Sequence, residues 1–394
     1  MNFTFINKFI FLFIISFVLT SCSTKTLYES VKLKKYEKPI IENFDQSKII
    51  LNESYLKKIN YNNKITLKGL REKNQNNYSA VIKNEEIFKI TNEKKFLKFD
   101  SKNGELLSSS QLDLEIDDED QIISFQYLDD SFVVAFKSGI IFKINSSGEI
   151  IWVHEENKIL NTPFTIHNEQ IILLYVDEIK SVSSITGYEI WSKTYEDIPV
   201  YQANGGQLAN FFNLLFFILP NNKIGSVDIN LGTTHPSDFN NLSLISSFNN
   251  AKDKIHIYNN LLSYLDEGKY LYTYDIFKDN FLFSKKNINK STSNNFFNNS
   301  LILKEGNYLQ AINILNGNTF WLISDKKISK KASIIKIRSI ENYIEIFLNN
   351  GDVLEINGDK LTEIYNLDVG KINNISFSKH NIIVNTERGE TVIF

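Results

Sequence analysis

Short apolar runs dominate the chain after about residue 60. Residues 131–136, 170–175 and 342–348 are examples, each rich in β-branched or aromatic side chains and bounded by Asn, Gly, Asp or Lys. Runs of this length with turn-forming residues at both ends are typical of β-strands. No segment after residue 60 keeps a helical period of 3.6 residues for long. The pattern therefore predicts an all-β domain.

One unit recurs along this domain: a strand, a turn that contains Gly or Asn, and a second strand that can end in Trp. The turn glycines Gly104 and Gly358 are 254 residues and six repeats apart, so the mean period is about 42 residues. A period of about 40–45 residues with several strands in each unit is typical of a β-propeller blade. The clear copies are residues 98–107, 143–152 and 183–191, and the weaker copies are residues 228–232, 275–280, 313–321 and 355–360.

The residue types of the unit fit a blade. Glycine tolerates the positive φ of a hairpin turn, and we expect it between the third and fourth strands. A tryptophan on the outer strand is large enough to fill the wedge between neighbouring blades, which stabilise one another by stacking. We therefore interpret Trp152, Trp191 and Trp321 as structural residues and not as a stack against a cofactor.

Seven copies of the unit and an incomplete eighth predict an eight-bladed β-propeller of four-stranded antiparallel blades. The C-terminal part adds three strand-like runs, residues 372–377, 381–384 and 389–394. We expect residues 63–68 to supply the missing outer strand and to close the ring, because closure removes an open sheet edge.

The N-terminus has the features of an exported lipoprotein. Lys8 precedes an apolar run of eleven residues, 9–19, which is too short for a transmembrane helix and fits the core of a secretory signal peptide. The run ends in a sequence that resembles the bacterial lipobox, with Leu19, Thr20 and Ser21 before Cys22. The resemblance implies cleavage before Cys22, a diacylglycerol on its thiol and acylation of its amine. More than one acyl chain gives stable membrane anchoring.

Three segments follow from these observations. We expect residues 1–21 to be a lipoprotein signal peptide, residues 22–60 a lipidated N-terminus and polar tether, and residues 61–394 the propeller. Ser23 follows Cys22 where an Asp often signals retention in the inner membrane. We therefore expect an outer-membrane anchor with the propeller in the periplasm.

Composition argues against several classes of function. The net charge of −3 disfavours a general nucleic-acid binder, which usually carries a basic excess. One cysteine forms no internal disulfide and no cysteine-rich metal site, and the five histidines lack metal-ligand spacing. The chain also lacks the common nucleophile and phosphate-binding motifs. We predict no catalytic residue, metal, cofactor or small-molecule substrate.

Residues 185–191, Ile-Thr-Gly-Tyr-Glu-Ile-Trp, resemble the PQQ-type propeller repeat. Together with the lipobox, the repeats resemble the BamB family, the propeller lipoproteins of the outer-membrane β-barrel assembly machinery. The resemblance implies a non-enzymatic scaffold. Its partners would be the periplasmic POTRA domains of a BamA-like barrel-inserting subunit and the other lipoproteins of the machinery, and it would assist insertion of outer-membrane proteins.

The resemblance also implies partner-binding residues in loops around the third to fifth blades. The corresponding positions are Ile198, Val200, Tyr201 and Gln202, and a second patch maps to Asp253. The first loop combines apolar and aromatic side chains with a proline that stiffens it. Such groups favour interfaces because they lose little entropy on docking.

Two other functions compete with this one. A generic periplasmic binding module would recruit a polysaccharide or another envelope complex through the propeller face. The repeat also resembles that of PQQ-dependent dehydrogenases. That resemblance would imply a Ca²⁺ site, a catalytic carboxylate and usually a vicinal disulfide, and this chain has only one cysteine.

Two charged stretches have simpler interpretations than a binding site. The acidic run 113–120 lacks the spacing of a calcium loop, so we expect a solvated loop between blades. The basic stretch 326–331 with Lys336 and Arg338 could contact acidic lipid or a partner, but we expect a charged surface at the start of the seventh blade.

Overall fold

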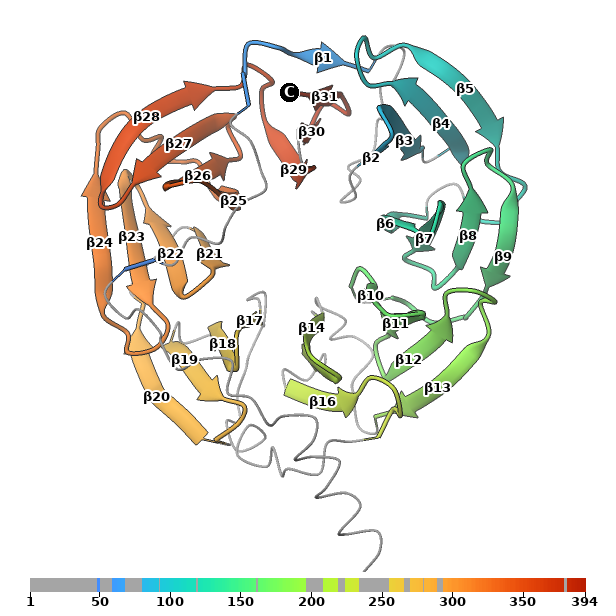
Figure 1. The fold of residues 1–394 in the computed structure, drawn as a ribbon, viewed down its shortest axis with the longest axis horizontal. Coiled ribbons are helices and arrows are strands. Elements are labelled where there is room, and N and C mark those ends of the chain that lie inside the picture. Colours follow the sequence, from blue (N-terminus) through green and yellow to red (C-terminus); the bar gives the residue numbers. More distant parts are fainter. Residues whose placement is uncertain are drawn as a thin grey trace, which may run out of the picture. The chain divides into compact units, whose positions relative to one another are not determined.

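Eight antiparallel sheets follow one another along the chain as the blades of a β-propeller (Figure 1). The computed structural model describes residues 48–49, 59–67, 80–91, 93–117, 120–160, 162–195, 208–218, 224–233, 255–265, 270–278, 280–288, 293–378 and 381–394. All of them belong to the compact unit Asp45–Phe394. The predicted all-β, eight-bladed propeller is confirmed.

The first four blades occupy the part of the chain before residue 229. Three of them have four strands each, and three strands of the fourth are described. Their strands are β2 (Val81–Lys83), β3 (Glu86–Ile90), β4 (Lys95–Asp100) and β5 (Leu106–Gln111); β6 (Ile122–Leu128), β7 (Ser131–Phe136), β8 (Ile141–Asn145) and β9 (Ile150–His154); β10 (Thr165–His167), β11 (Gln170–Leu174), β12 (Glu178–Ser183) and β13 (Glu189–Thr194); and β14 (Leu208–Phe211), β15 (Leu214–Ile218) and β16 (Ile224–Asp228).

The other four blades have four strands each, and the eighth takes one of them from the N-terminal side of the first blade. Their strands are β17 (His256–Tyr258), β18 (Leu261–Leu265), β19 (Tyr270–Asp275) and β20 (Asn280–Asn287); β21 (Ser293–Phe297), β22 (Ser300–Glu305), β23 (Tyr308–Asn313) and β24 (Thr319–Ser324); β25 (Ile334–Ile340), β26 (Tyr343–Leu348), β27 (Asp352–Asn357) and β28 (Lys360–Asn366); and β29 (Ile372–Phe377), β30 (Ile382–Thr386), β31 (Thr391–Ile393) and β1 (Ile65–Thr66).

Burial within a blade follows the position of the strand. All six residues of β7 and all five of β15 are buried, because both faces of a second strand pack against neighbouring blades. The outer strand β5 has no buried residue. The core is therefore a series of layers between blades, which is why these strands are almost continuously apolar.

The repeated turn has the predicted conformation and position. Gly187 lies between β12 and β13 with φ 75°, and Gly232 follows β16 with φ 66°. The predicted wedge role of tryptophan is also confirmed, since Trp152 is 8% exposed on β9 and Trp321 is 7% exposed on β24.

The short strand β1 pairs with the last strand of the chain. Ile65 lies opposite Ile393 and Thr66 opposite Val392 in the antiparallel register, and the Leu67 amide donates to the carbonyl of Thr391 at 3.1 Å. Residues near both ends of the described chain thus share one sheet (Figure 1).

The expectation of a charged surface at the start of the seventh blade is wrong for Arg338. This side chain is buried on β25, where its Nη2 lies 2.5 Å from Oε2 of the fully buried Glu345. Tyr61 completes the group by donating to the same oxygen at 2.7 Å. An unpaired charge in the core is costly, and Glu345 provides the partner that the buried Arg338 requires. In the acidic run, by contrast, Asp113, Glu115 and Asp117 are exposed.

Candidate functional site: the apolar rim of blades two to four

All site residues predicted from the sequence lie outside the described part of the chain. These are Leu19, Thr20, Ser21, Cys22, Ile198, Val200, Tyr201, Gln202 and Asp253. The predicted partner loop falls in residues 196–207, between β13 of the third blade and β14 of the fourth. The described strands on either side of this loop therefore define the surface next to it.

That surface carries a row of exposed apolar side chains, which we call the apolar rim. It lies on the outer strands and turns of blades two to four (Figure 1, green). Tyr188 is the most exposed member at 78%, followed by Leu231 at 66%. The other members are Ile151, Val153, Ile185 and Ile190.

Two turns of the rim each lie on the outer strand of the preceding blade. A methyl group placed on Gly187 would be 2.7 Å from the ring of Trp152, between Ile151 and Val153 on β9. Gly232 has the same relation to Trp191, its methyl lying 2.6 Å from that ring. The turns that carry Tyr188 and Leu231 therefore lie against the tryptophan side of the preceding outer strand, and Ile151 and Val153 alternate with Trp152 along β9.

Outer strands on the opposite side of the ring differ. The outer strand of the seventh blade, β28, exposes Lys360, Thr362, Glu363 and Asn366. In β24 of the sixth blade, Leu322 is an exposed apolar residue at 63%. Within the described residues, blades two to four carry more large exposed apolar side chains per blade than the other blades do, where the exposed ones are Leu106, Leu107, Leu282, Tyr308 and Leu322. Clusters of this kind mark interaction surfaces more often than isolated ones do.

An ion-pair network fixes the blade two–three junction under the rim. Lys180, 6% exposed in its side chain, binds Glu156 and reaches Glu189 Oε2 at 2.9 Å. Lys158 binds Glu178 at 2.6 Å. These pairs connect the loop after β9 with β12 and β13, so they stabilise the relative position of two blades.

The network shifts the pKa values of its members. Burial alone would lower the pKa of Lys180, but hydrogen bonds to Glu156 and Glu189 raise it above its ordinary value. The hydrogen bond from Lys180 lowers the pKa of Glu189. Burial lowers the pKa of His154 from its ordinary 6.5, against the opposing effect of its 3.0 Å hydrogen bond to the carbonyl of Gly187. Lys180 and Glu189 therefore stay ionised, while His154 favours its neutral form near pH 7.

This surface combines paired ionisable groups with exposed apolar side chains. Ionisable groups near it are committed to one another, and the apolar side chains outside are free to pack against another molecule. In the described ranges no three His, Cys, Asp or Glu side chains are arranged to hold a metal ion. The same ranges contain no helix with the length and apolar character needed to cross a membrane.

Comparison with known proteins supports the fold. No protein-family model matches the chain, and no curated protein matches its sequence. Similar solved structures include BamB from Moraxella catarrhalis, with a TM-score of 0.60, 13% identity, and coverage of 84% of this chain and 99% of that one. The computationally designed protein Ika8 gives a TM-score of 0.60 at 12% identity, covering 82% and 99% of the two chains. Saccharomyces cerevisiae Sqt1 gives 0.57 at 9% identity, covering 79% and 92%.

The class that these likenesses define is the β-propeller. BamB, a designed protein and a yeast protein share one architecture with this chain at very low identity, so the likeness describes the fold alone.

Sequence reasoning missed the apolar rim, although its signal was present. Ile185, Tyr188 and Ile190 belong to the motif that identified the repeat. In a blade whose outer strand faces solvent, alternate residues of that strand must be exposed, so Ile190 beside Trp191 was a candidate surface residue.

Proposed function

We propose that this chain is a non-enzymatic scaffold lipoprotein of the outer-membrane β-barrel assembly machinery. In this role the propeller stays in the periplasm on a lipid anchor at Cys22. It binds the POTRA domains of a BamA-like subunit and works beside the other lipoproteins of the machinery. The sequence resemblance motivates the family, and the likeness of fold to BamB supports it.

The apolar rim is the observation that carries the proposal. It has the exposed aromatic and aliphatic side chains that interfaces favour, on a scaffold that ion pairs hold in place. Its strand β13 leads directly into residues 196–207, which contain the predicted partner residues. We propose that the rim and this loop form one docking surface, because rigid anchors beside a loop are a common way to build an interface.

Co-purification of the tagged native lipoprotein tests the proposal. The unchanged chain should bring down the BamA-like subunit. Tyr188→Asp places a charge at the centre of the rim and should reduce that recovery at least tenfold, since buried tyrosines often contribute about 2 kcal/mol or more to interfaces. Tyr201→Asp should have a similar effect. The melting temperature should change little for Tyr188→Asp, because the side chain is 78% exposed.

Leu322→Asp is the matched control. Leu322 directly follows a blade tryptophan on an outer strand, as Val153 does, but on the sixth blade. It should leave recovery unchanged. Equal loss in Leu322→Asp and Tyr188→Asp, or no loss in either, contradicts docking at the rim. Recovery of a different stable partner without any BamA-like subunit would favour the generic binding module instead.

The anchor has its own test. Cys22→Ser removes the thiol that the lipobox supplies, so we expect an unprocessed or soluble periplasmic form by fractionation. A processed Cys22→Ser chain that still fractionates with the outer membrane refutes lipidation at this residue.

A further inference from the structure

Two blade tryptophans are covered in the same way by the turn of the next blade. Trp152 Nε1 donates to the carbonyl of Ser184 at 3.2 Å, and Gly187 lies on the indole ring. Trp191 Nε1 donates to the carbonyl of Ile229 at 2.7 Å, and Gly232 lies on that ring. In both pairs the glycine comes three residues after the carbonyl acceptor.

The length of the turn makes this cover possible. In the third blade, the Ser183 amide bonds the carbonyl of Tyr188 across four intervening residues, and Asp228 and Thr233 close a turn of equal length in the fourth blade. In the seventh blade, Asn357 pairs directly with Lys360, so only Gly358 and Asp359 form the turn. This turn is two residues shorter than its counterparts.

The tryptophan that this short turn should cover is Trp321. Its side chain is only 7% exposed, yet its Nε1 has no hydrogen-bond partner in the part of the chain that the structure describes. A methyl group on Gly358 would have no atom within 4 Å, in contrast to the 2.7 Å contact at Gly187. A buried donor without a partner costs about 1–3 kcal/mol, so Trp321 is poised for an acceptor.

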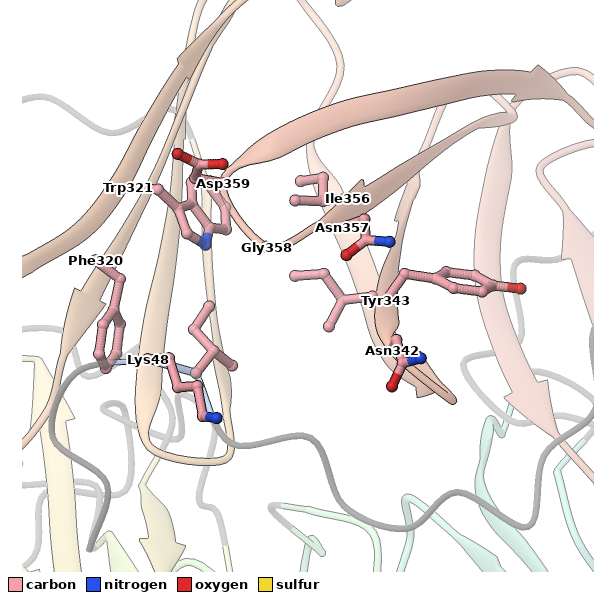
Figure 2. A pocket seen from close by; sticks show the side chains of 11 residues that line it. Lys48, Phe320, Trp321, Asn342, Tyr343, Ile356, Asn357, Gly358 and Asp359 are labelled. Carbon is pink, nitrogen blue, oxygen red and sulfur yellow. The ribbon is translucent and has the colours of Figure 1, made fainter.

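A cavity of ≈390 Å³ lies between blades six and seven, beside the short turn and Trp321 (Figure 2). Such a volume is within the range of about 300–1,000 Å³ for ligand sites. Its floor is buried and contains Trp321, Ile344 and Ile356. Lys48 and Ile49, from the chain before the first blade, line one wall, and Ile49 packs against the same apolar cluster. Its mouth is exposed and polar, with Asn342 and Asp359 among its residues.

We propose that this cavity is a second docking site, which takes a glycine-containing turn of a partner protein. A main-chain carbonyl of the partner accepts the hydrogen bond of Trp321 Nε1. A glycine three residues further on lies against the indole ring. The side-chain amides at the mouth, Asn342 and Asn357, contact the polar backbone of the turn.

The molecule itself identifies this occupant. The equivalent positions over Trp152 and Trp191 hold a polypeptide turn with a carbonyl and a glycine at fixed spacing. A partner turn would reproduce contacts that this fold already makes twice, and it would satisfy a buried donor that has no acceptor among the described residues. The site lies on the opposite side of the ring from the apolar rim, so it does not depend on the proposed function (Figure 1).

Titration with a defined peptide tests the proposal. The probe is a cyclic peptide with the sequence of residues 183–188, Ser-Ser-Ile-Thr-Gly-Tyr. The full-length chain is labelled with ¹⁵N, and its three indole N–H signals are assigned with single Trp→Phe variants. We expect a saturable shift of the Trp321 signal and no shift for Trp152 or Trp191. Trp321→Phe should weaken binding about fivefold or more, because it removes one hydrogen bond.

Two controls make the outcome decisive. The same peptide with valine in place of its glycine should not bind, because a side chain would collide with the ring. A chain with two residues inserted between Gly358 and Asp359 should cover Trp321 itself and lose binding. The proposal is overturned if the valine peptide binds equally well, if no Trp321 shift occurs, or if the Trp321 indole is already protected in the free full-length chain, which would place the chain's own segment in the cavity.

Discussion

The blade two–three and blade six–seven junctions use the same tryptophan but different turns. At the first junction, Gly187 lies on Trp152, the indole N–H has a carbonyl acceptor, and the ion pair of Lys180 with Glu156 connects the two blades. At the second, the turn is two residues shorter and a cavity replaces it over Trp321. The tryptophan alone therefore does not close a junction between blades. The length of the turn in the next blade determines whether the indole is covered by that turn or borders a cavity.

The largest effect that would break this comparison comes from the turn glycines. Gly187→Ala should lower the free energy of unfolding by about 2–4 kcal/mol, because a methyl group meets the ring of Trp152 at 2.7 Å and φ is 75°. Gly358→Ala should cost only about 1 kcal/mol, from its positive φ alone. Urea unfolding of the two variants measures the difference. Equal costs would mean that a methyl group on Gly187 does not clash with the indole of Trp152 at the blade two–three junction.

A smaller effect should separate the two tryptophans. Trp152→Phe removes one of the two donors to the carbonyl of Ser184, the other being Lys143 Nζ at 3.0 Å, whereas Trp321→Phe removes a donor that has no acceptor in the described chain. We expect Trp152→Phe to cost about 1 kcal/mol more than Trp321→Phe in chemical denaturation. If Trp321→Phe proves the more destabilising change, the open junction has been misidentified.

The smallest effect is the contribution of His154, at the blade two–three junction, to the pH dependence of stability. The folded pKa of His154 is lower than its ordinary 6.5, because burial disfavours the charged ring. The unfolded chain therefore binds a proton first, and stability present above pH 6.5 declines as the pH falls towards the folded pKa. The slope cannot exceed about 1.4 kcal/mol per pH unit for one proton.

His154→Gln should reduce this slope between pH 7 and pH 5 in thermal unfolding. Burial also lowers the pKa of His256, so a residual slope is expected from that residue. Ile323 occupies the position of His154 in the open junction and does not titrate. An unchanged slope in His154→Gln would show that this histidine does not report on the junction.

The repeat made the fold predictable from the sequence. Glycines such as Gly104 and Gly187 occupy the same turn in different blades, and tryptophans such as Trp152 occupy the same position of the outer strand. Local turn chemistry and long-range stacking therefore indicate one architecture. The burial of Arg338 was not predictable, because its partner Glu345 is identified only once β25 and β26 pair. The open junction left a trace in the sequence, since residues 355–360 contain a shorter turn than residues 183–191.

The candidate sites were harder to predict. The apolar rim depends on which side of each outer strand faces solvent, and that depends on the packing of the next turn. The cavity over Trp321 accompanies a turn that is two residues shorter than those of the third and fourth blades, and no single side chain in the sequence marks that difference.

Hydrogen exchange of the three indole N–H groups distinguishes a closed junction from an open one. In the free full-length chain at neutral pH, we expect slow exchange for Trp152 and Trp191, whose indoles donate to main-chain carbonyls, and fast exchange for Trp321. Protection of all three to the same degree would contradict an open junction between blades six and seven.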